Sequence, residues 1–91
     1  MMSEPTQEIP GIDFLRYVLE SICDDKSELS IEGRIDELGV LLTVRTSERD
    51  MGKLIGKGGQ TVKALRTLLR ILGSGSKQRI NLKIMEPNEA A

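Results

Sequence analysis

The chain has 91 residues and a net charge of −1, with one cysteine and no histidine. This length allows one small domain with a surface groove rather than a deep enclosed site. A single cysteine excludes an internal disulfide, and the lack of histidine removes the commonest general base and metal ligand. The sequence contains no apolar run of about 18 residues, so no membrane span is predicted. The first residues are polar and do not match the pattern of a signal peptide. We therefore expect a cytoplasmic protein with no metal, cofactor, membrane contact or small-molecule substrate.

The first half of the chain predicts a tail, a helix and a hairpin. Residues 1–11 are polar, contain two prolines and are predicted to form a flexible tail. Asp13 is expected to cap a helix that ends near Asp24 or Asp25 and has one apolar stripe. Alternating apolar residues then predict two strands, over residues 31–36 and 40–45, which form an antiparallel hairpin.

The second half predicts two helices, a loop between them and a third strand. Ser47-Glu48-Arg49-Asp50 resembles a capping box with aspartate in place of glutamate, and predicts a short helix ending near Leu54 and Ile55. After residues 56–59 a second helix is expected to end at Leu72, with Gly73 as a left-handed cap. Its predicted buried stripe consists of Val62, Leu65, Leu68, Leu69 and Leu72. Residues 80–84 alternate as a strand.

This order, α-β-β-α-α-β, predicts an α+β fold with two layers. A three-stranded sheet is expected to be covered on one face by three helices. We expect the domain to span residues 12–86, between the flexible tails 1–11 and 87–91.

Charge is distributed unevenly along the chain. Residues 1–50 contain five basic and twelve acidic residues, a balance of −7, whereas residues 51–91 contain eight basic and two acidic residues, a balance of +6. Such asymmetry is typical of a protein with one positive face. A solvated, dipolar surface with no ligand is the plainer interpretation, but the positive segment also contains a glycine-rich loop.

The loop Gly56-Lys57-Gly58-Gly59 has the composition of a site for a phosphate backbone. Glycine lets another molecule's backbone approach closely, and a lysine ammonium suits phosphate. A P-loop is excluded because the glycine spacing is too short and Lys57 is not followed by Ser or Thr. A dinucleotide fingerprint is excluded because Thr61 stands where the third glycine is required. The remaining interpretation is that the loop and the helices on either side form a helix–GXXG–helix clamp.

Residues 54–65, Leu54-Ile55-Gly56-Lys57-Gly58-Gly59-Gln60-Thr61-Val62-Lys63-Ala64-Leu65, resemble the KH-domain signature. That signature is I-G-x-x-G followed by an apolar residue three positions on. The extra helix and strand before the core match the type II arrangement. The resemblance covers about residues 12–86. It is closest to the small, stand-alone bacterial KH RNA-binding proteins of the KhpA type.

The resemblance implies a site for single-stranded RNA, because KH domains clamp four nucleotides with the GXXG loop. The loop residues are Gly56, Lys57, Gly58 and Gly59, with Lys57 expected to contact phosphate. Ile55 and Val62 are expected near a groove for bases, with Leu42 or Val44 adjacent, although each is also compatible with plain core. The second-rank electrostatic candidates are Lys53, Lys63, Arg66 and Arg70. Arg66 and Arg70 are equally compatible with an ordinary solvated helix face.

A further apolar stripe on the second helix consists of Ala64, Leu68 and Ile71. The resemblance implies a homodimer interface there, while a wider core stripe is the alternative. A single domain without an aromatic stacking platform is expected to bind RNA weakly. Dimerisation would raise the avidity for RNA.

Two functions of different class follow. The first is a non-catalytic, single-stranded RNA-binding protein that acts as an RNA chaperone or post-transcriptional regulator. The alternative is a KH-fold dimerisation or protein-interaction module with little RNA affinity, for which the resemblance suggests a larger KH-containing partner of the Jag type. An enzyme is disfavoured, because the positive segment has no carboxylate pair and no nucleophile beside a base. We predict no catalytic residues.

Overall fold

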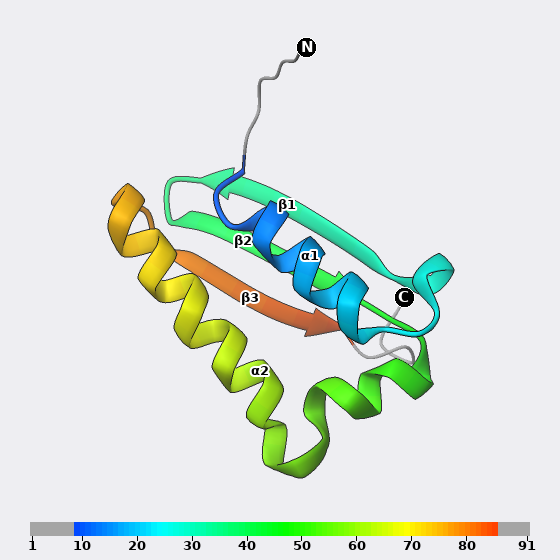
Figure 1. Ribbon diagram of the computed structural model, residues 1–91. Helices are drawn as coiled ribbons and strands as arrows, with labels where there is room; N and C mark the ends of the chain where they lie inside the picture. The colour runs from blue at the N-terminus through cyan, green and yellow to red at the C-terminus, as the bar shows by residue number, and fades with distance from the viewer. Residues whose placement is uncertain (1–8, 86–91) are drawn as a thin grey trace.

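The computed structural model of the protein describes residues 9–85, apart from the side chains of Lys57 and Ser76. The elements are α1 (Ile12–Ile22), the short 3-10 helix η1 (Lys26–Glu28), β1 (Ser30–Asp36), β2 (Gly39–Arg45), α2 (Glu48–Ser76) and β3 (Ile80–Met85). The helices α1 and α2 lie on one side of the sheet (Figure 1), which confirms the predicted two-layer α+β fold. Residues 1–8 and 87–91 of the two predicted tails lie outside the described residues.

The sheet has the order β1-β2-β3, so β2 is central and β3 has one free edge. Strands β1 and β2 pair antiparallel from Ser30↔Arg45 to Asp36↔Gly39, which confirms the predicted hairpin. Gly39 has φ 123°, and a Cβ there would collide with the carbonyl oxygen of Arg79. Strand β3 pairs parallel with β2, so the sheet is mixed.

The core lies between the helices and the inner face of the sheet. It is formed by the buried side chains of Leu15, Leu19, Val40, Leu42, Val44, Leu54, Val62, Leu65, Leu69, Ile80 and Leu82. Burying each of these side chains contributes roughly 1.5–3 kcal/mol relative to exposure. Ile9, which the sequence places in the N-terminal tail, also packs against this core.

Helix α1 begins two residues earlier than predicted. Its N-cap is Gly11, with φ 86°, rather than Asp13, which lies in the first turn. The carbonyl oxygen of Gly11 accepts a hydrogen bond from the Leu15 N–H at 3.0 Å. Glycine adopts this left-handed conformation without the steric cost of a side chain, so it replaces the expected side-chain cap.

The two helices predicted on either side of the glycine loop form one continuous helical element, α2, which turns sharply (Figure 1). The turn occurs where Gly58 and Gly59 have φ 73° and 75°. We call residues 48–57 the short arm of α2 and residues 60–76 the long arm. Two successive glycines in the left-handed region therefore change the direction of the chain at the predicted position.

The predicted end of α2 at Leu72 is wrong, because the helix continues to Ser76. Lys77, with φ 59° and ψ 35°, supplies the left-handed cap that was expected at Gly73. Gly73 is instead buried within the helix, and its carbonyl oxygen accepts the Gln78 N–H at 2.8 Å. A Cβ at Gly73 would collide with the carbonyl oxygen of Gln78, so this glycine permits a close chain approach.

Candidate nucleic-acid interface

The loop at residues 56–59 presents backbone without side-chain cover. A Cβ built on Gly56, Gly58 or Gly59 would meet no other atom within 4 Å. The positive φ at positions 58 and 59 favours glycine there. At position 56, neither the backbone angle nor the packing calls for glycine. The backbone of Lys57 lies in the same turn, and its side chain lies outside the described atoms. The long arm begins directly after this turn.

Asp50 fixes the short arm to the segment that follows α1. Its side chain is 0% exposed and accepts hydrogen bonds from the Asp24 and Asp25 N–H groups at 3.0 and 2.9 Å. Its own N–H donates to Ser47 Oγ at 3.2 Å, so one half of the predicted capping box forms. The carboxylate does not complete the box, because its oxygens accept these hydrogen bonds from the segment after α1 instead. This connection determines where the short arm, and hence the loop, lies relative to α1.

The negative charge of Asp50 is stabilised by backbone N–H groups and by the nearby Lys53. The Asp24 and Asp25 N–H groups hold the pKa of Asp50 below its ordinary value, and Lys53 acts in the same direction. Lys53 Nζ lies 2.7 Å from the Asp24 carboxylate, which raises the lysine pKa, and 3.8 Å from Asp50. The charge of Lys53 is therefore matched by neighbouring carboxylates, which weakens its prediction as an electrostatic contact. Cys23 is buried beside this group, and burial raises the pKa of its thiol, as expected for an unreactive cysteine.

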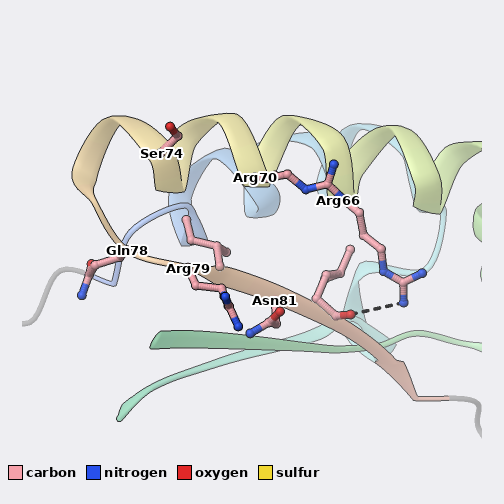
Figure 2. Close-up of a pocket in the computed structure, with 8 residues that line it drawn as sticks. Arg66, Arg70, Ser74, Gln78, Arg79 and Asn81 are labelled. Atoms are coloured by element: carbon pink, nitrogen blue, oxygen red, sulfur yellow. Dashed lines mark hydrogen bonds between the residues drawn. The ribbon is translucent and has the colours of Figure 1, made fainter. Parts of the chain in front are cut away.

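A groove of about 600 Å³ lies between the long arm and β3. It is lined by Arg66, Arg70 and Ser74 from α2 and by Gln78, Arg79, Ile80, Asn81 and Leu82 from the β3 side (Figure 2). Arg66 Nη2 donates to the carbonyl oxygen of Leu82 at 3.2 Å. Two of the four predicted electrostatic candidates, Arg66 and Arg70, therefore lie together, whereas Lys63 is exposed and does not line the groove. Sequence reasoning did not select Arg79, although it directly precedes the alternating pattern of β3.

The positions of Leu42 and Val44 fit the plain-core alternative. Both side chains are fully buried in β2, the central strand, beneath the helices. The groove follows the edge strand β3 instead. Val62 is 5% exposed and belongs to the core, whereas Ile55 is 41% exposed and can be reached from solvent.

The long arm also carries exposed apolar side chains. Val62, Leu65 and Leu69 are buried as predicted, but Leu68 and Leu72 are 45% and 43% exposed, so their assignment to the core is wrong. Ile71 is 62% exposed, and Ala64 is exposed as well. Residues three or four positions apart share a helix face, so these side chains form one surface. We call this surface the apolar patch; it consists of Ala64, Leu68, Ile71 and Leu72.

Residues 9–85 show few other kinds of site. Across this range, no group of three or more His, Cys, Asp or Glu side chains is placed to hold a metal ion. Neither α1 nor α2, the two α-helices of the described chain, combines the length and the apolar character needed to cross a membrane. The features that stand out are therefore the bare glycine turn, the arginine-lined groove and the apolar patch.

Most of this chain matches known proteins in sequence. The model of a family described as KhpA/KhpB, KH domain, matches residues 12–84, which include the glycine turn. A protein of Chlamydia caviae named RNA-binding protein KhpA is 35% identical over 74 residues, which cover 81% of this chain and 95% of the relative. Proteins of the same name from Leifsonia xyli and Borreliella burgdorferi are 34% and 29% identical, over 75% and 82% of this chain and 90% and 92% of their own lengths. With nearly the whole fold matched, this chain belongs to the KhpA/KhpB KH-domain family.

Proposed function

We propose that this protein is a non-catalytic, single-stranded RNA-binding protein that holds the RNA backbone at residues 56–59. The observation that supports the proposal most strongly is the exposed turn of α2, where three glycines leave the backbone open. A phosphate can approach such a backbone more closely than one that carries side chains. The relatives named RNA-binding proteins share the matched region, which is why RNA is the ligand proposed here.

The electrostatics of α2 favour an anion at this position. The long arm starts at the turn, and the N-terminus of a helix attracts phosphate through its free N–H groups and its dipole. Lys57 adds a positive charge, and no Asp or Glu occurs in the sequence between Met51 and Met85. A chain with a net charge of −1 can therefore still present a positive surface to RNA.

The variant Gly56→Asp with Lys57→Asp tests this proposal. Gly56 tolerates a Cβ, so the variant should fold, but two carboxylates would repel phosphate at the turn. We expect affinity for a single-stranded oligonucleotide to fall roughly tenfold or more, because one hydrogen bond to a charged group contributes about 1.5–3 kcal/mol. Fluorescence anisotropy would measure binding, and circular dichroism would check the fold.

The matched control is Arg16→Asp with Ser30→Asp, which changes net charge by the same amount at two exposed positions outside α2. This control should keep most of its RNA affinity. If both variants lose affinity equally, binding depends on overall charge and not on the turn. If neither loses affinity, the assignment of residues 56–59 is wrong.

We further propose a role as an RNA chaperone or post-transcriptional regulator in the cytoplasm. The proposed contacts go to phosphate, and no aromatic residue follows Tyr17, so the stacking that strengthens other RNA modules is missing from this part of the chain. Weak binding with little sequence preference suits a protein that acts on many RNAs. Crosslinking in cells followed by sequencing tests this role; recovery of a single RNA with one sequence motif would contradict it.

The apolar patch supports a second candidate function, dimerisation or protein interaction. Exposed apolar surface on a small domain is often covered by a partner. We propose a homodimer through this patch, or a complex with a larger KH-containing protein of the Jag type. Leu68→Glu with Ile71→Glu should convert the dimer to a monomer, which light scattering after gel filtration would measure.

Leu38→Glu is the control for this test, because Leu38 is 79% exposed but lies in the hairpin turn and not on α2. It should leave the oligomeric state unchanged. A wild-type protein that is monomeric at all concentrations would contradict the homodimer. Pull-down of a partner that resists nuclease and requires Leu68 would support the heteromeric complex instead.

A further inference from the structure

Strand β1 has an outer edge that carries unpaired backbone groups. The Val40 N–H donates to the Arg79 carbonyl oxygen at 2.7 Å, so Val40 directs its backbone groups toward β3. Backbone groups alternate along a strand, so Leu41 and the other odd-numbered residues of β2 face β1 instead. Leu41 is paired with Arg34, and the even-numbered residues of β1 therefore bond to β2. The odd-numbered residues of β1 face outward.

These outward-facing residues are Ile31, Gly33 and Ile35. Within residues 9–85, β1 is the first strand of the sheet order, and no other strand pairs with its outer edge. Proteins often protect such an edge with proline, lysine or a bulge. Strand β1 contains neither proline nor lysine, and its register with β2 is continuous over seven residues. The edge is therefore open to a further strand.

The sequence of β1 is complementary to itself in the antiparallel direction. If two copies of β1 pair about Gly33, Glu32 lies opposite Arg34 of the second copy. In the same register Ile31 lies opposite Ile35 of the second copy. Both pairings occur twice because the arrangement has a twofold axis. Opposite charges and apolar side chains placed in this way stabilise a pair of strands.

The direction of the backbone groups agrees with this register. It places the outward-facing residues opposite one another, as hydrogen-bonded pairs, and places Glu32 and Arg34 in the non-hydrogen-bonded pairs, where side chains approach most closely. Moving the second strand by two residues keeps the hydrogen bonds but sets Glu32 opposite Glu32, or Arg34 opposite Arg34. Like charges directly opposite are destabilising, so the charges select one register.

The side chains that would meet are available. Glu32 and Arg34 are exposed, and within residues 9–85 neither forms an ion pair in its own chain. Ile35 is 49% exposed, so a large part of an apolar side chain would be covered by the second strand.

We propose that β1 is an interface for a second copy of this chain, in which the two β1 strands pair antiparallel about Gly33. The result is one continuous sheet with three strands from each copy. The twofold axis is perpendicular to this sheet, so the helices of both copies lie on the same face. The glycine turn lies away from β1 (Figure 1), so each copy keeps its turn open.

This interface is separate from the apolar patch, which lies on α2, and does not depend on RNA as the ligand. Pairing along one strand buries few apolar side chains, so the contact is weaker than a packed helical interface. We expect it to form in concentrated protein and to dissociate at the dilution of gel filtration.

Charge reversal tests the interface, in nuclease-treated protein that carries Leu68→Glu and Ile71→Glu to remove association through the patch. This parent protein should pass from monomer to dimer as its concentration rises in sedimentation equilibrium. Adding Glu32→Arg alone, or Arg34→Glu alone, should raise the dissociation constant roughly tenfold or more, because two opposite-charge pairs become two like-charge pairs. An equal mixture of the two variants should associate again, because each arginine then meets a glutamate.

The matched control is Glu48→Arg alone, Arg49→Glu alone and their mixture, at exposed neighbouring positions on α2. These proteins should associate like the parent, and circular dichroism should show the same fold for every variant. Amide hydrogen exchange at Ile31, Gly33 and Ile35 should slow in the concentrated parent and in the mixture of the β1 variants.

Four results would overturn the proposal. The parent could remain monomeric at every concentration, or the single β1 variants could associate as strongly as the parent. The mixture of β1 variants could fail to recover association, which would exclude this register. The control variants could show the same loss and recovery, which would assign the effect to overall charge and not to β1.

Discussion

Gly52 and Gly56 lie one turn apart on the short arm of α2 and offer a direct comparison of two glycines. A Cβ on either would meet nothing within 4 Å, and neither has a positive φ. Glycine inside a helix costs about 1 kcal/mol relative to alanine. The fold therefore gains nothing from either glycine, but only Gly56 belongs to the GXXG loop.

Gly56→Ala is expected to stabilise the protein and weaken RNA binding at the same time. The added methyl group removes the helix penalty of glycine, roughly 0.5–1 kcal/mol, but blocks the close approach of a phosphate backbone. Gly52→Ala should raise the urea midpoint by a similar amount and leave RNA affinity unchanged. Urea denaturation and anisotropy on both variants would check this. Equal RNA affinity for the two variants would show that the missing Cβ at Gly56 is not used by the ligand.

Helical spacing predicts which residues of the long arm share a face. Arg66 and Arg70 are four positions apart and therefore share the groove face. The sequence left two positions open for Leu42 and Val44, beside a groove or in the core, because alternation shows which face of a strand is apolar but not whether the strand is central. Leu68 and Leu72 look the same in sequence as Leu65 and Leu69, and only packing against the sheet separates buried from exposed leucines.

At the scale of elements, Asp50 links the end of α1 to the start of α2. Two backbone N–H groups, from Asp24 and Asp25, hold the pKa of this buried carboxylate below the ordinary aspartate value of 3.8. A lowered pKa means that the ionised form stabilises the folded state. That contribution is complete above the unfolded value of 3.8 and is lost as pH falls through the lower folded value.

Asp50→Asn is expected to lower the urea midpoint at neutral pH, because the side-chain amide cannot replace a carboxylate that accepts two N–H groups. The difference from the wild type should narrow as pH falls below the ordinary aspartate value of 3.8. Glu48→Gln, at an exposed position in the same turn, is the control and should change little. A difference that stays constant down to strongly acidic pH would contradict the role of the ionised carboxylate.

The elements themselves could largely be predicted from the sequence. Period-2 alternation located all three strands to within a residue or two, and glycines at the loop located the turn of α2. The end of α2 could not be predicted, since a glycine after an apolar stripe usually ends a helix. Gly73 continues the helix because its missing Cβ admits the carbonyl of Gln78, a contact made only after the chain folds back.

At the scale of the whole molecule, the parallel pairing of β2 with β3 creates the candidate interface. It leaves β3 with a free edge beside the long arm, and the groove follows that edge. Strand order depends on contacts between distant segments, which local patterns do not specify, so this edge was not predicted from the sequence. The charge asymmetry of the chain did anticipate a positive region, and the three arginines of the groove all come from its positive half.

The most direct test of RNA binding at the glycine turn is an NMR titration of the isotope-labelled protein with a single-stranded oligonucleotide. The account predicts that the largest changes in backbone amide shift occur at residues 56–60, with further changes around Arg66, Arg70 and Arg79. Changes should be small on α1 and β1, which lie away from the turn and the groove (Figure 1). Amide signals of residues 56–60 that do not move at saturating RNA would contradict the account.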